Sequence, residues 1–187
     1  FDKDKEALLE VNPKLIRKLK PHQVEAVKFL WDSCVEDLDR LQTEEGSGCI
    51  LAHCMGLGKT LSVITFISSL MFNEELTKVR TCLVVTPLNT VLNWQAEFQK
   101  WLGEDSMEVY EMSSIKNNWG RADTLQAWQD SGGILIIGYE LYRILTMHQR
   151  VKNKKQKKIF TETLADPGRC KMKWSTKETS HVHFYHP

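Results

Sequence analysis

ILAHCMGLGKT, residues 50–60, is an apolar run that breaks into a loop with two glycines and ends in Gly-Lys-Thr. A backbone that wraps closely around phosphate oxygens cannot carry a β-carbon at every turn, and Gly56 and Gly58 give it that freedom. Backbone N–H groups can then converge on a phosphate, Lys59 can neutralise its charge, and the Thr60 hydroxyl can ligate Mg²⁺. The stretch therefore predicts a nucleotide phosphate-binding loop.

The residues on either side of this loop fit a strand before it and a helix after it. Apolar residues recur at helical spacing after Thr60, at Leu61, Ile64 and Met71, and the N-terminus of such a helix would add its dipole to an anion site. The full phosphate-loop pattern GxxxxGK[ST] would place a glycine at position 53, where this chain has His53. A Gly-Lys-Thr sequence that begins a helix by chance is the alternative, and the agreement of strand, loop and helix argues against it.

The composition is that of an ordinary globular domain, with 187 residues, 42% hydrophobic and 26% charged, and a net charge of +1. This charge excludes a wholly basic nucleic-acid binder, so any contact with DNA must be regional. The five cysteines are odd in number and form no Cys-x-x-Cys pair, which favours a reducing compartment, the cytosol or the nucleus. No apolar run is long enough to cross a bilayer, and no signal peptide is recognisable. Because the first residue is Phe1, we expect the sequence to be part of a longer protein.

Apolar periodicity alternates between helix and strand along the chain. Helical patterns cover residues 21–41, 60–72, 88–101, 122–128 and 141–145. Short apolar runs typical of buried strands cover residues 81–86, 108–112 and 134–138. This alternation predicts an α/β fold with a parallel sheet flanked by helices.

Two regions near the C-terminus differ from the rest. Residues 150–158 (RVKNKKQKK) hold six basic side chains and no acidic one, which fits a solvated basic surface, contact with a DNA backbone, or a nuclear-import signal. From Arg169 onward the sequence has no clear period and no strand pattern, and we expect poor order there. His53 and Cys54 are too few ligands for a zinc site. The spacing of the possible ligands in the tail matches no zinc site either; they are Cys170, His181, His183 and His186.

The most specific motifs of the chain are KPHQVEAVKFLWD (20–32), GSGCILAHCMGLGKT (46–60), VVTPLNTVLNWQAEFQKW (84–101) and GGILIIGYELYR (132–143). With these motifs the chain resembles the first RecA-like lobe of the Swi/Snf-type helicase-like ATPases, a family of chromatin remodellers. Most of the family has Asp-Glu where this chain has His53-Cys54, and the His-Cys version marks a subgroup. The resemblance implies an incomplete RecA-like, P-loop NTPase lobe. Residues 1–20, which are charged and have only a partial apolar face, are predicted to be an N-terminal docking segment. They are followed by a partial ATP-binding lobe (21–168) and a divergent tail (169–187).

The resemblance also implies ATP and Mg²⁺ as cofactors and assigns roles to matching positions. The residues that would bind ATP are Gln23, His53, Cys54, Met55, Gly56, Leu57, Gly58, Lys59 and Thr60, with Thr60 also holding Mg²⁺. Gln23 would read adenine, because its amide donates and accepts at once; a helix-surface glutamine without a ligand is the alternative. The residues that would contact DNA are Thr86, Pro87, Asn89, Gly138 and Tyr139. Turn formation alone also explains Pro87, and packing at a strand end also explains Tyr139.

The activity implied by the resemblance is that of a nuclear, DNA-dependent ATPase that translocates on duplex DNA and nucleosomes, with chromatin proteins as further partners. In the family, the segment after the position of Asp166-Pro167-Gly168 enters a strand that ends in Asp-Glu-Gly-His, whose acidic pair holds Mg²⁺ and orients the attacking water. This sequence contains no such tetrad, nor a second lobe with its arginine finger. We therefore expect the chain alone to bind ATP without being catalytically competent.

Two other functions remain as alternatives at this point. A truncated, non-catalytic fragment that binds nucleotide or DNA would fit the same residues, because it needs the phosphate loop and not the acidic pair. A P-loop kinase or GTPase is disfavoured, because His53 replaces the loop glycine and Gln23 precedes the loop by a helix.

Overall fold

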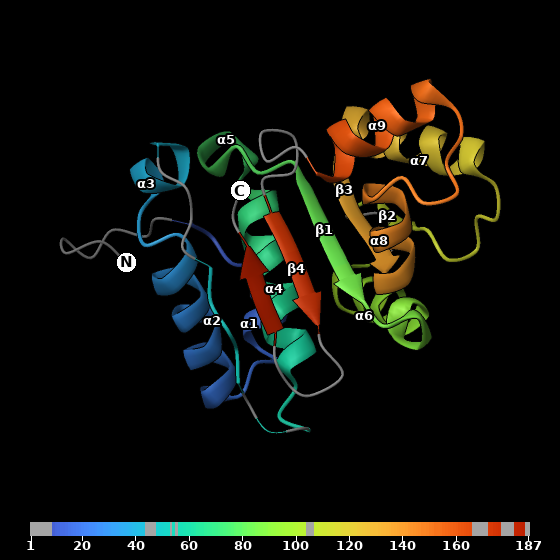
Figure 1. Ribbon diagram of the computed structural model, residues 1–187. Helices are drawn as coiled ribbons and strands as arrows, with labels where there is room; N and C mark the ends of the chain where they lie inside the picture. The colour runs from blue at the N-terminus through green and yellow to red at the C-terminus, as the bar shows by residue number, and fades with distance from the viewer. Residues whose placement is uncertain are drawn as a thin grey trace.

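A five-stranded sheet forms the centre of the molecule, in the strand order β2-β3-β1-β4-β5 (Figure 1). The computed structural model describes residues 9–43, 48–52, 54, 56–103, 107–165, 172–176 and 182–185. The strands are β1 (Thr81–Thr86), β2 (Val109–Glu111), β3 (Gly133–Gly138), β4 (Met172–Thr176) and β5 (Val182–Tyr185). Strands β2, β3, β1 and β4 are parallel to their neighbours, whereas β5 is antiparallel to β4.

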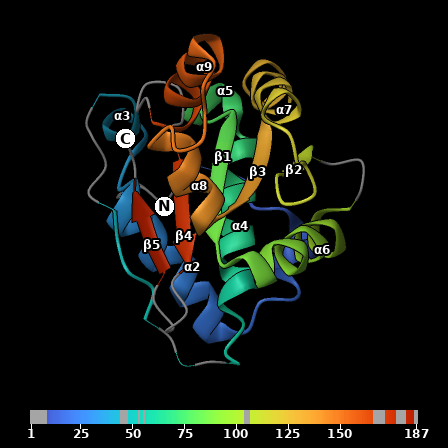
Figure 2. The same cartoon turned by 45° about the vertical axis from the view of Figure 1, so that its right-hand side comes forward.

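The helices cover both faces of this sheet (Figures 1 and 2). They are α1 (Pro13–Ile16), α2 (Pro21–Cys34), α3 (Leu38–Thr43), α4 (Lys59–Phe72), α5 (Glu74–Thr77), the 3₁₀ helix η1 (Leu88–Thr90), α6 (Val91–Leu102), α7 (Asn118–Ser131), α8 (Tyr139–Thr146) and α9 (Lys154–Leu164). Helices α2, α4 and α6 pack on one face, and α7, α8 and α9 on the other. The α/β fold class, a parallel sheet flanked by helices, is confirmed. Within the described ranges, a membrane-spanning helix is not found.

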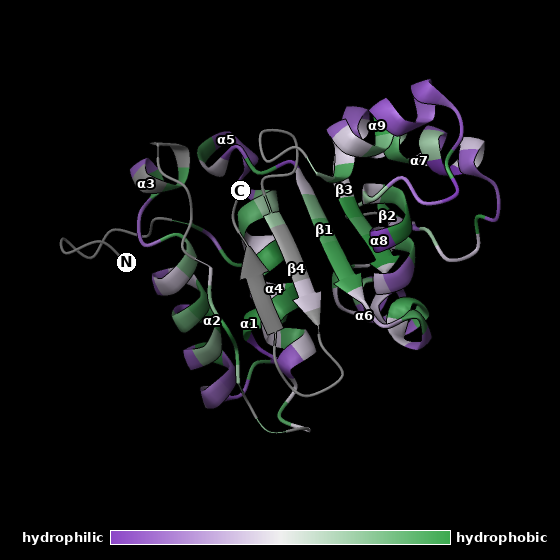
Figure 3. Cartoon of the chain, in the orientation of Figure 1, coloured by the Kyte–Doolittle hydropathy of each residue, from purple (hydrophilic) through white to green (hydrophobic). Residues whose placement is uncertain are grey.

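Strands β1 and β3 are covered on both faces, and every residue of each is buried. Because side chains alternate across a strand, Cys82 and Val84 enter the core on the α4 side, while Leu83 and Val85 enter the core on the α7 side. Figure 3 shows both strands as largely hydrophobic. The continuous apolar runs in the sequence reflect this two-sided burial.

Helix α4 is buried on all sides, and every residue from Leu61 to Met71 is buried. Two of its buried hydroxyls are bonded within the helix: Thr65 Oγ1 donates to the carbonyl of Leu61 over 2.8 Å, and Ser69 Oγ donates to the carbonyl of Thr65 over 2.7 Å. These bonds allow Thr65 and Ser69 to lie in the core, whereas Ser62 Oγ is buried without a hydrogen-bond partner among the described residues. The sequence predicts only one apolar stripe here, because these hydroxyl residues conceal the remaining buried surface.

The helical pattern predicted from Pro21 to Leu41 is two helices and not one. Helix α2 ends at Cys34, and Glu36 has a φ of +61°, which turns the chain before α3 begins. The buried line of α2 consists of Gln23, Ala26, Leu30 and Cys34. Half-buried beside it lie Val24, Val27 and Trp31. The helix is therefore rotated slightly from the predicted apolar face, which turns Gln23 inward.

The apolar run before the phosphate loop is not a strand of the sheet, so that prediction is wrong. Ile50 makes one isolated β-bridge, and Leu51 and Ala52 have no regular secondary structure. Leu51 is nevertheless buried in the core on the α4 side, so packing alone accounts for its apolar character. Both edges of β1 are already paired, with β3 and with β4, which leaves no place beside β1 for this segment.

Two strands follow Arg169, where the sequence predicts none. Strand β4 pairs in parallel with β1, and Met172 joins the core beside α4; β5 then pairs with β4. An unpaired edge of β1 would expose a row of backbone donors and acceptors, and β4 satisfies them although its own sequence has no marked strand pattern. The division of the chain into 1–20, 21–168 and 169–187 stays a prediction.

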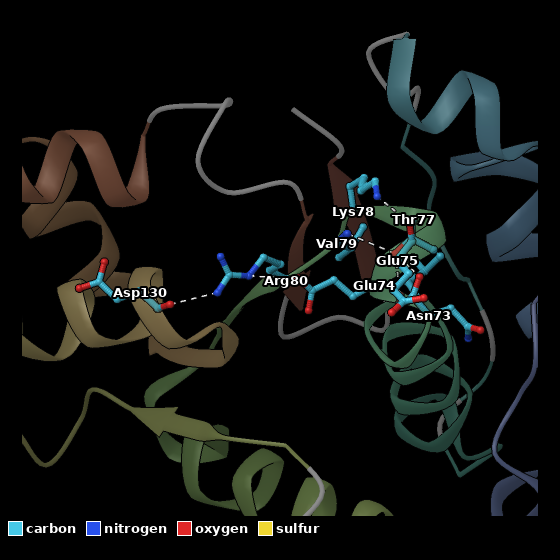
Figure 4. Close-up of polar contacts among 9 residues, drawn as sticks. Asn73, Glu74, Glu75, Thr77, Lys78, Val79, Arg80 and Asp130 are labelled. Atoms are coloured by element: carbon cyan, nitrogen blue, oxygen red, sulfur yellow. Dashed lines mark hydrogen bonds and ion pairs between the residues drawn. The ribbon is translucent and has the colours of Figure 1, made fainter.

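Arg80, just before β1, joins three segments at the amino end of the sheet (Figure 4). Its Nε lies 3.2 Å from Glu74 Oε1, one of its terminal nitrogens donates to the carbonyl of Asp130 over 3.0 Å, and its own carbonyl accepts the N–H of Gly133 over 2.9 Å. A β-carbon on Gly132, whose φ is +80°, would lie 2.9 Å from the Arg80 carbonyl oxygen. Only glycine allows β3 to begin this close to the start of β1.

Candidate functional site

The loop before α4 turns on two glycines in the left-handed region. Gly56 has a φ of +84° and Gly58 a φ of +72°, and Gly58 is the N-cap of α4. Lys59 is the first residue of the helix, at the end where the helix dipole places partial positive charge. The exposed residues of the loop include Cys54 and Leu57, and the half-buried ones include Thr60. His53 and Met55 lie outside the described residues.

Gln23 packs directly against this loop. Its Nε2 donates to the carbonyls of Leu57 and Gly58 over 3.2 and 3.3 Å, and its Oε1 accepts the backbone N–H of Lys20 over 2.9 Å. The side chain is buried, with 6% of its surface exposed. A β-carbon at position 58 would displace the Gln23 amide, the movable end of that side chain, and the positive φ is what requires glycine here. The structure thus brings Gln23 to the loop, and its role in binding ATP stays a prediction.

Two further side chains bond to the loop carbonyls. Lys59 Nζ donates to the carbonyl of Cys54 over 3.2 Å, which holds the ammonium against the loop. His22 Nε2 lies 3.1 Å from the carbonyl oxygen of Leu57, a contact that requires a proton on Nε2. His22 is not among the residues that the sequence predicts for the site. Its position next to Gln23 at the start of α2 is the one feature of the sequence that could have indicated a place in the site.

This arrangement has the chemistry of an anion site. Several loop carbonyls accept bonds from Gln23 and Lys59, so the positive end of the α4 dipole and the Lys59 ammonium dominate the local field. A β-carbon built on Gly56 would have no atom within 4 Å, which leaves room beside the loop. Among the described residues, no group of three or more His, Cys, Asp or Glu side chains is placed to hold a metal.

A second polar group lies at the carboxyl end of β1. The hydroxyls of Thr86 and Thr90 are 2.6 Å apart, and Thr90 Oγ1 donates to the carbonyl of Pro87 over 2.8 Å. These bonds fix the turn into η1 and α6. Asn89, in η1, is exposed, whereas Thr86 is fully buried. Thr86 therefore supports the turn, and Asn89 is on its solvent side.

The end of β3 lies beside this turn. Gly138 pairs with Thr86 in the sheet, and a β-carbon on Gly138 would lie 3.6 Å from the Leu88 Cα. Tyr139 is half-buried, and its hydroxyl lies 3.4 Å from Ser175 Oγ of β4. All five residues predicted to contact DNA thus lie at one edge of the sheet. Packing and turn formation account for Thr86, Gly138 and Tyr139 as they stand.

The phosphate loop and this carboxyl edge lie toward the same end of the molecule. In Figure 1 the loop that enters α4 is at the lower end, where the arrowheads of β1 and β4 also point. Parallel strands bring their carboxyl ends to one edge of a sheet, which is where α/β proteins place their ligand sites. The two groups of predicted residues therefore lie toward the same end of the molecule although they are separated in the sequence.

Three known proteins show how far this chain is shared with relatives. It is 47% identical to the transcriptional regulator ATRX of Homo sapiens over 171 residues, which cover 89% of this chain and 7% of that protein. It is 47% identical to the ATRX homolog of Drosophila melanogaster over 174 residues, 90% of this chain and 13% of that protein. Helicase ARIP4 of Mus musculus is 40% identical over 162 residues, 78% of this chain and 11% of that protein. The chain thus spans a small part of the length of these relatives.

Residues 22–175 match the family described as the SNF2-related domain. The matched span contains Gln23, the phosphate loop and the carboxyl-edge residues, and it continues past Gly168 to residue 175, which lies in β4. The chain is therefore a region of an SNF2-family ATPase related to ATRX, as its motifs predict. The chain belongs to the SNF2-related domain family.

Proposed function

We propose that this chain is the ATP-binding part of a nuclear, DNA-dependent ATPase that translocates on duplex DNA to remodel chromatin. The observation that carries the proposal is the contact of the Gln23 amide with the carbonyls of Leu57 and Gly58, at the N-terminus of the buried helix α4. This contact brings together two motifs that are separated in the sequence and forms one site with anion-binding chemistry. Nucleosomes and chromatin proteins are the proposed partners of the whole protein.

In this proposal the loop from His53 to Gly58 surrounds the phosphates of ATP with backbone N–H groups. Lys59 exchanges its bond with the Cys54 carbonyl for the β- and γ-phosphate oxygens, and Thr60 holds Mg²⁺ from the first turn of α4. The bound Mg²⁺ supplies charge neutralisation to the phosphates. The half-buried position of Lys59 and Thr60 supports these roles, because burial strengthens charge-assisted bonds.

Gln23 is proposed to read adenine. Its Nε2 has two N–H donors, which lie near two loop carbonyls, and its Oε1 is bonded to Lys20. Recognition of adenine would therefore exchange one loop bond for a bond to the base. Such an exchange would couple occupation of the base site to the position of the loop.

The carboxyl edge is proposed to follow the backbone of one DNA strand. Exposed Asn89, its exposed neighbour Leu88 and the N-terminus of α6 support this role, because phosphate contacts come from amides and helix N-termini. Thr86, Pro87, Gly138 and Tyr139 would hold this surface in place. If Asn89 contacts a phosphate, Asn89→Ala lowers duplex affinity about equally for unrelated sequences and leaves its salt dependence unchanged, because the neutral amide displaces no counterion; an unchanged affinity argues against the contact.

The chain alone is proposed to bind ATP with negligible turnover, which agrees with the alternative of a non-catalytic fragment. The sequence has no Asp-Glu-Gly-His tetrad that could orient water. In related phosphoryl-transfer enzymes an arginine finger alone contributes about 10³ to 10⁵ in rate. ATP turnover by the chain with and without duplex DNA tests this point. Hydrolysis at an ordinary enzymatic rate without DNA contradicts it.

Binding of a fluorescent ATP analogue tests the nucleotide site itself. Lys59→Ala removes the ammonium from the phosphates and should weaken binding by about 10- to 100-fold, the usual value of a charge-assisted bond. The matched control is Lys100→Ala, which removes an exposed lysine that pairs with Glu97 and lies over the Trp101 ring on α6, and it should leave binding unchanged. Equal affinity of the wild-type chain and Lys59→Ala would overturn the proposed site.

A further inference from the structure

Two cysteine sulfurs meet at the far end of α2 from Gln23. Cys34 Sγ lies 3.4 Å from Cys49 Sγ, and both are free thiols. Cys34 is the last residue of α2 and is 5% exposed, whereas Cys49, in the segment that leads to the phosphate loop, is half-buried. We propose that Cys34 and Cys49 form a redox modification site, at which a peroxide converts the two thiols into a reversible disulfide. This inference does not depend on nucleotide binding.

The geometry suits the formation of this bond. A disulfide has a sulfur–sulfur distance of about 2.05 Å, so the two sulfurs need to approach by about 1.4 Å. Cys34 is held at the end of a helix, while Cys49 has no regular secondary structure and its neighbour Ile50 makes only an isolated bridge. The segment around Cys49 can therefore make the small movement while α2 stays in place.

The surroundings give the two thiols different roles. The hydrogen bond with Cys49, reinforced by burial, raises the pKa of Cys34 and keeps its proton on sulfur. The hydrogen bonds from Cys34 and Ser33 lower the pKa of Cys49, although burial acts in the opposite direction. Because the thiolate is the reactive form, the more accessible Cys49 is the sulfur that meets the oxidant, and Cys34 is the sulfur that resolves the product.

The reaction uses one hydrogen peroxide molecule and two thiols. The Cys49 thiolate attacks one peroxide oxygen, the O–O bond breaks, and the departing hydroxide takes a proton to leave as water. Cys49 is then a sulfenic acid. The Cys34 sulfur gives up its proton and attacks Cys49 sulfur, the S–O bond breaks, and the second water leaves. The two thiols together lose two electrons, which reduce the peroxide to two waters.

Peptide mapping of the full chain tests the site directly. The reduced chain is treated with hydrogen peroxide, the remaining thiols are blocked with N-ethylmaleimide, and the sample is digested with trypsin without reductant. Trypsin cuts after Lys28, Arg40 and Lys59, so Cys34 and Cys49 fall on different peptides, 29–40 and 41–59. The expected product is these two peptides joined by a disulfide, which dithiothreitol separates.

Because Cys54 shares a peptide with Cys49, three variants assign the bond. The joined peptides should persist in Cys54→Ser and vanish in Cys49→Ser and Cys34→Ser. Cys34 is buried, so Cys34→Ser can lower the folded fraction of the chain. Cys49 is only half-buried, so Cys49→Ser tests the bond in a chain that stays folded. A joined product that requires Cys54, or oxidation of Cys49 to a sulfinic acid with no joined peptide, would overturn the proposal.

A thermal measurement gives an independent readout. The bond would close a loop whose two cysteines are 15 positions apart, and such a loop raises the Tm of a domain of this size by about 5–10 °C. The rise should disappear after dithiothreitol and should be absent in Cys49→Ser. An oxidised chain with joined peptides and a lower Tm would contradict the geometric fit.

Discussion

The two ends of the central sheet use the same strands for different purposes. At the amino end of β1 and β3, the backbone is closed by short contacts: Gly133 N–H donates to the Arg80 carbonyl and Ile134 N–H to the Glu108 carbonyl, each over 2.9 Å. At the carboxyl end, exposed Asn89 and the glycine loop before α4 lie toward solvent. The amino end therefore maintains the fold, and the carboxyl end carries the groups that we propose for ligand binding.

The glycines show the same contrast at single positions. A β-carbon on Gly133, whose φ is +108°, would lie 2.5 Å from the Glu108 carbonyl oxygen, so both its space and its φ are fixed by the fold. Gly56 has a positive φ as well, but a β-carbon there would meet nothing within 4 Å. A glycine with open space around it is the kind that a close-fitting ligand requires.

The largest effect is expected at the amino end. Gly133→Ala should lower the free energy of unfolding by about 3 kcal/mol or more, because it combines a collision with a backbone carbonyl and an unfavourable φ. Gly56→Ala is the matched variant, because it introduces an unfavourable φ without a collision, and it should lower the free energy of unfolding by about 1–2 kcal/mol. Urea unfolding followed by circular dichroism measures both. Equal losses in the two variants would remove the distinction between the two ends.

An intermediate effect is expected for Gln23, whose amide lies between fold and ligand. Gln23→Ala should cost about 2 kcal/mol of stability, because it removes the bond to the Lys20 N–H and leaves two loop carbonyls without this donor. Gln23→Glu is the matched control, because it keeps an acceptor for Lys20 and places a carboxylate against the carbonyls of Leu57 and Gly58. Thermal unfolding and ATP-analogue binding separate the two roles.

The outcome that would contradict this view of Gln23 is specific. If Gln23→Glu binds the ATP analogue as well as the wild-type chain does, nucleotide binding needs no N–H donor at position 23, either to hold the loop or to bind adenine. If Gln23→Ala loses less than about 0.5 kcal/mol, the bonds of this buried side chain do not stabilise α2, contrary to the usual cost of an unpaired buried group.

The smallest effect is expected for Arg80, although it joins three segments (Figure 4). Its ion pair with Glu74 is half-exposed, with 52% of each side chain accessible, and solvent screens such pairs. Arg80→Ala should therefore cost only about 0.5–1 kcal/mol, most of it from the bond to the Asp130 carbonyl. Urea unfolding at low and high salt measures this loss. A loss above about 2 kcal/mol would show that the amino end depends on the side chain and not on backbone contacts.

The parts of the fold that the sequence predicts are those with a strong local signal. The runs that became β1 and β3 are mostly apolar because both faces are covered, and the glycine pair before Lys59 marks a turn that few other residues can make. Gln23 could be joined to the loop only through the family resemblance. The rotation that buries it on α2 depends on α4, which a local pattern does not contain.

The parts that the sequence does not predict depend on pairing between distant segments. Ile50 and Leu51 have the composition of a strand, but the edge beside β1 is taken by β4. Strand β4 in turn has little strand character of its own and forms because β1 presents open backbone groups. The contact between Cys34 and Cys49 had no signal either, since their spacing matches no known cysteine motif.

The pairing of β1 with β4 also has a consequence for synthesis on the ribosome. Cys82 pairs with Met172, so about 90 residues must be translated after β1 before its second edge is complete. At about 5–20 residues per second this takes roughly 5–20 s. During that interval the nascent chain displays an apolar strand with one unpaired side, which is a ready partner for other chains. Chaperone capture between the emergence of β1 and that of β4 is therefore the stage of biogenesis at which this fold is most vulnerable.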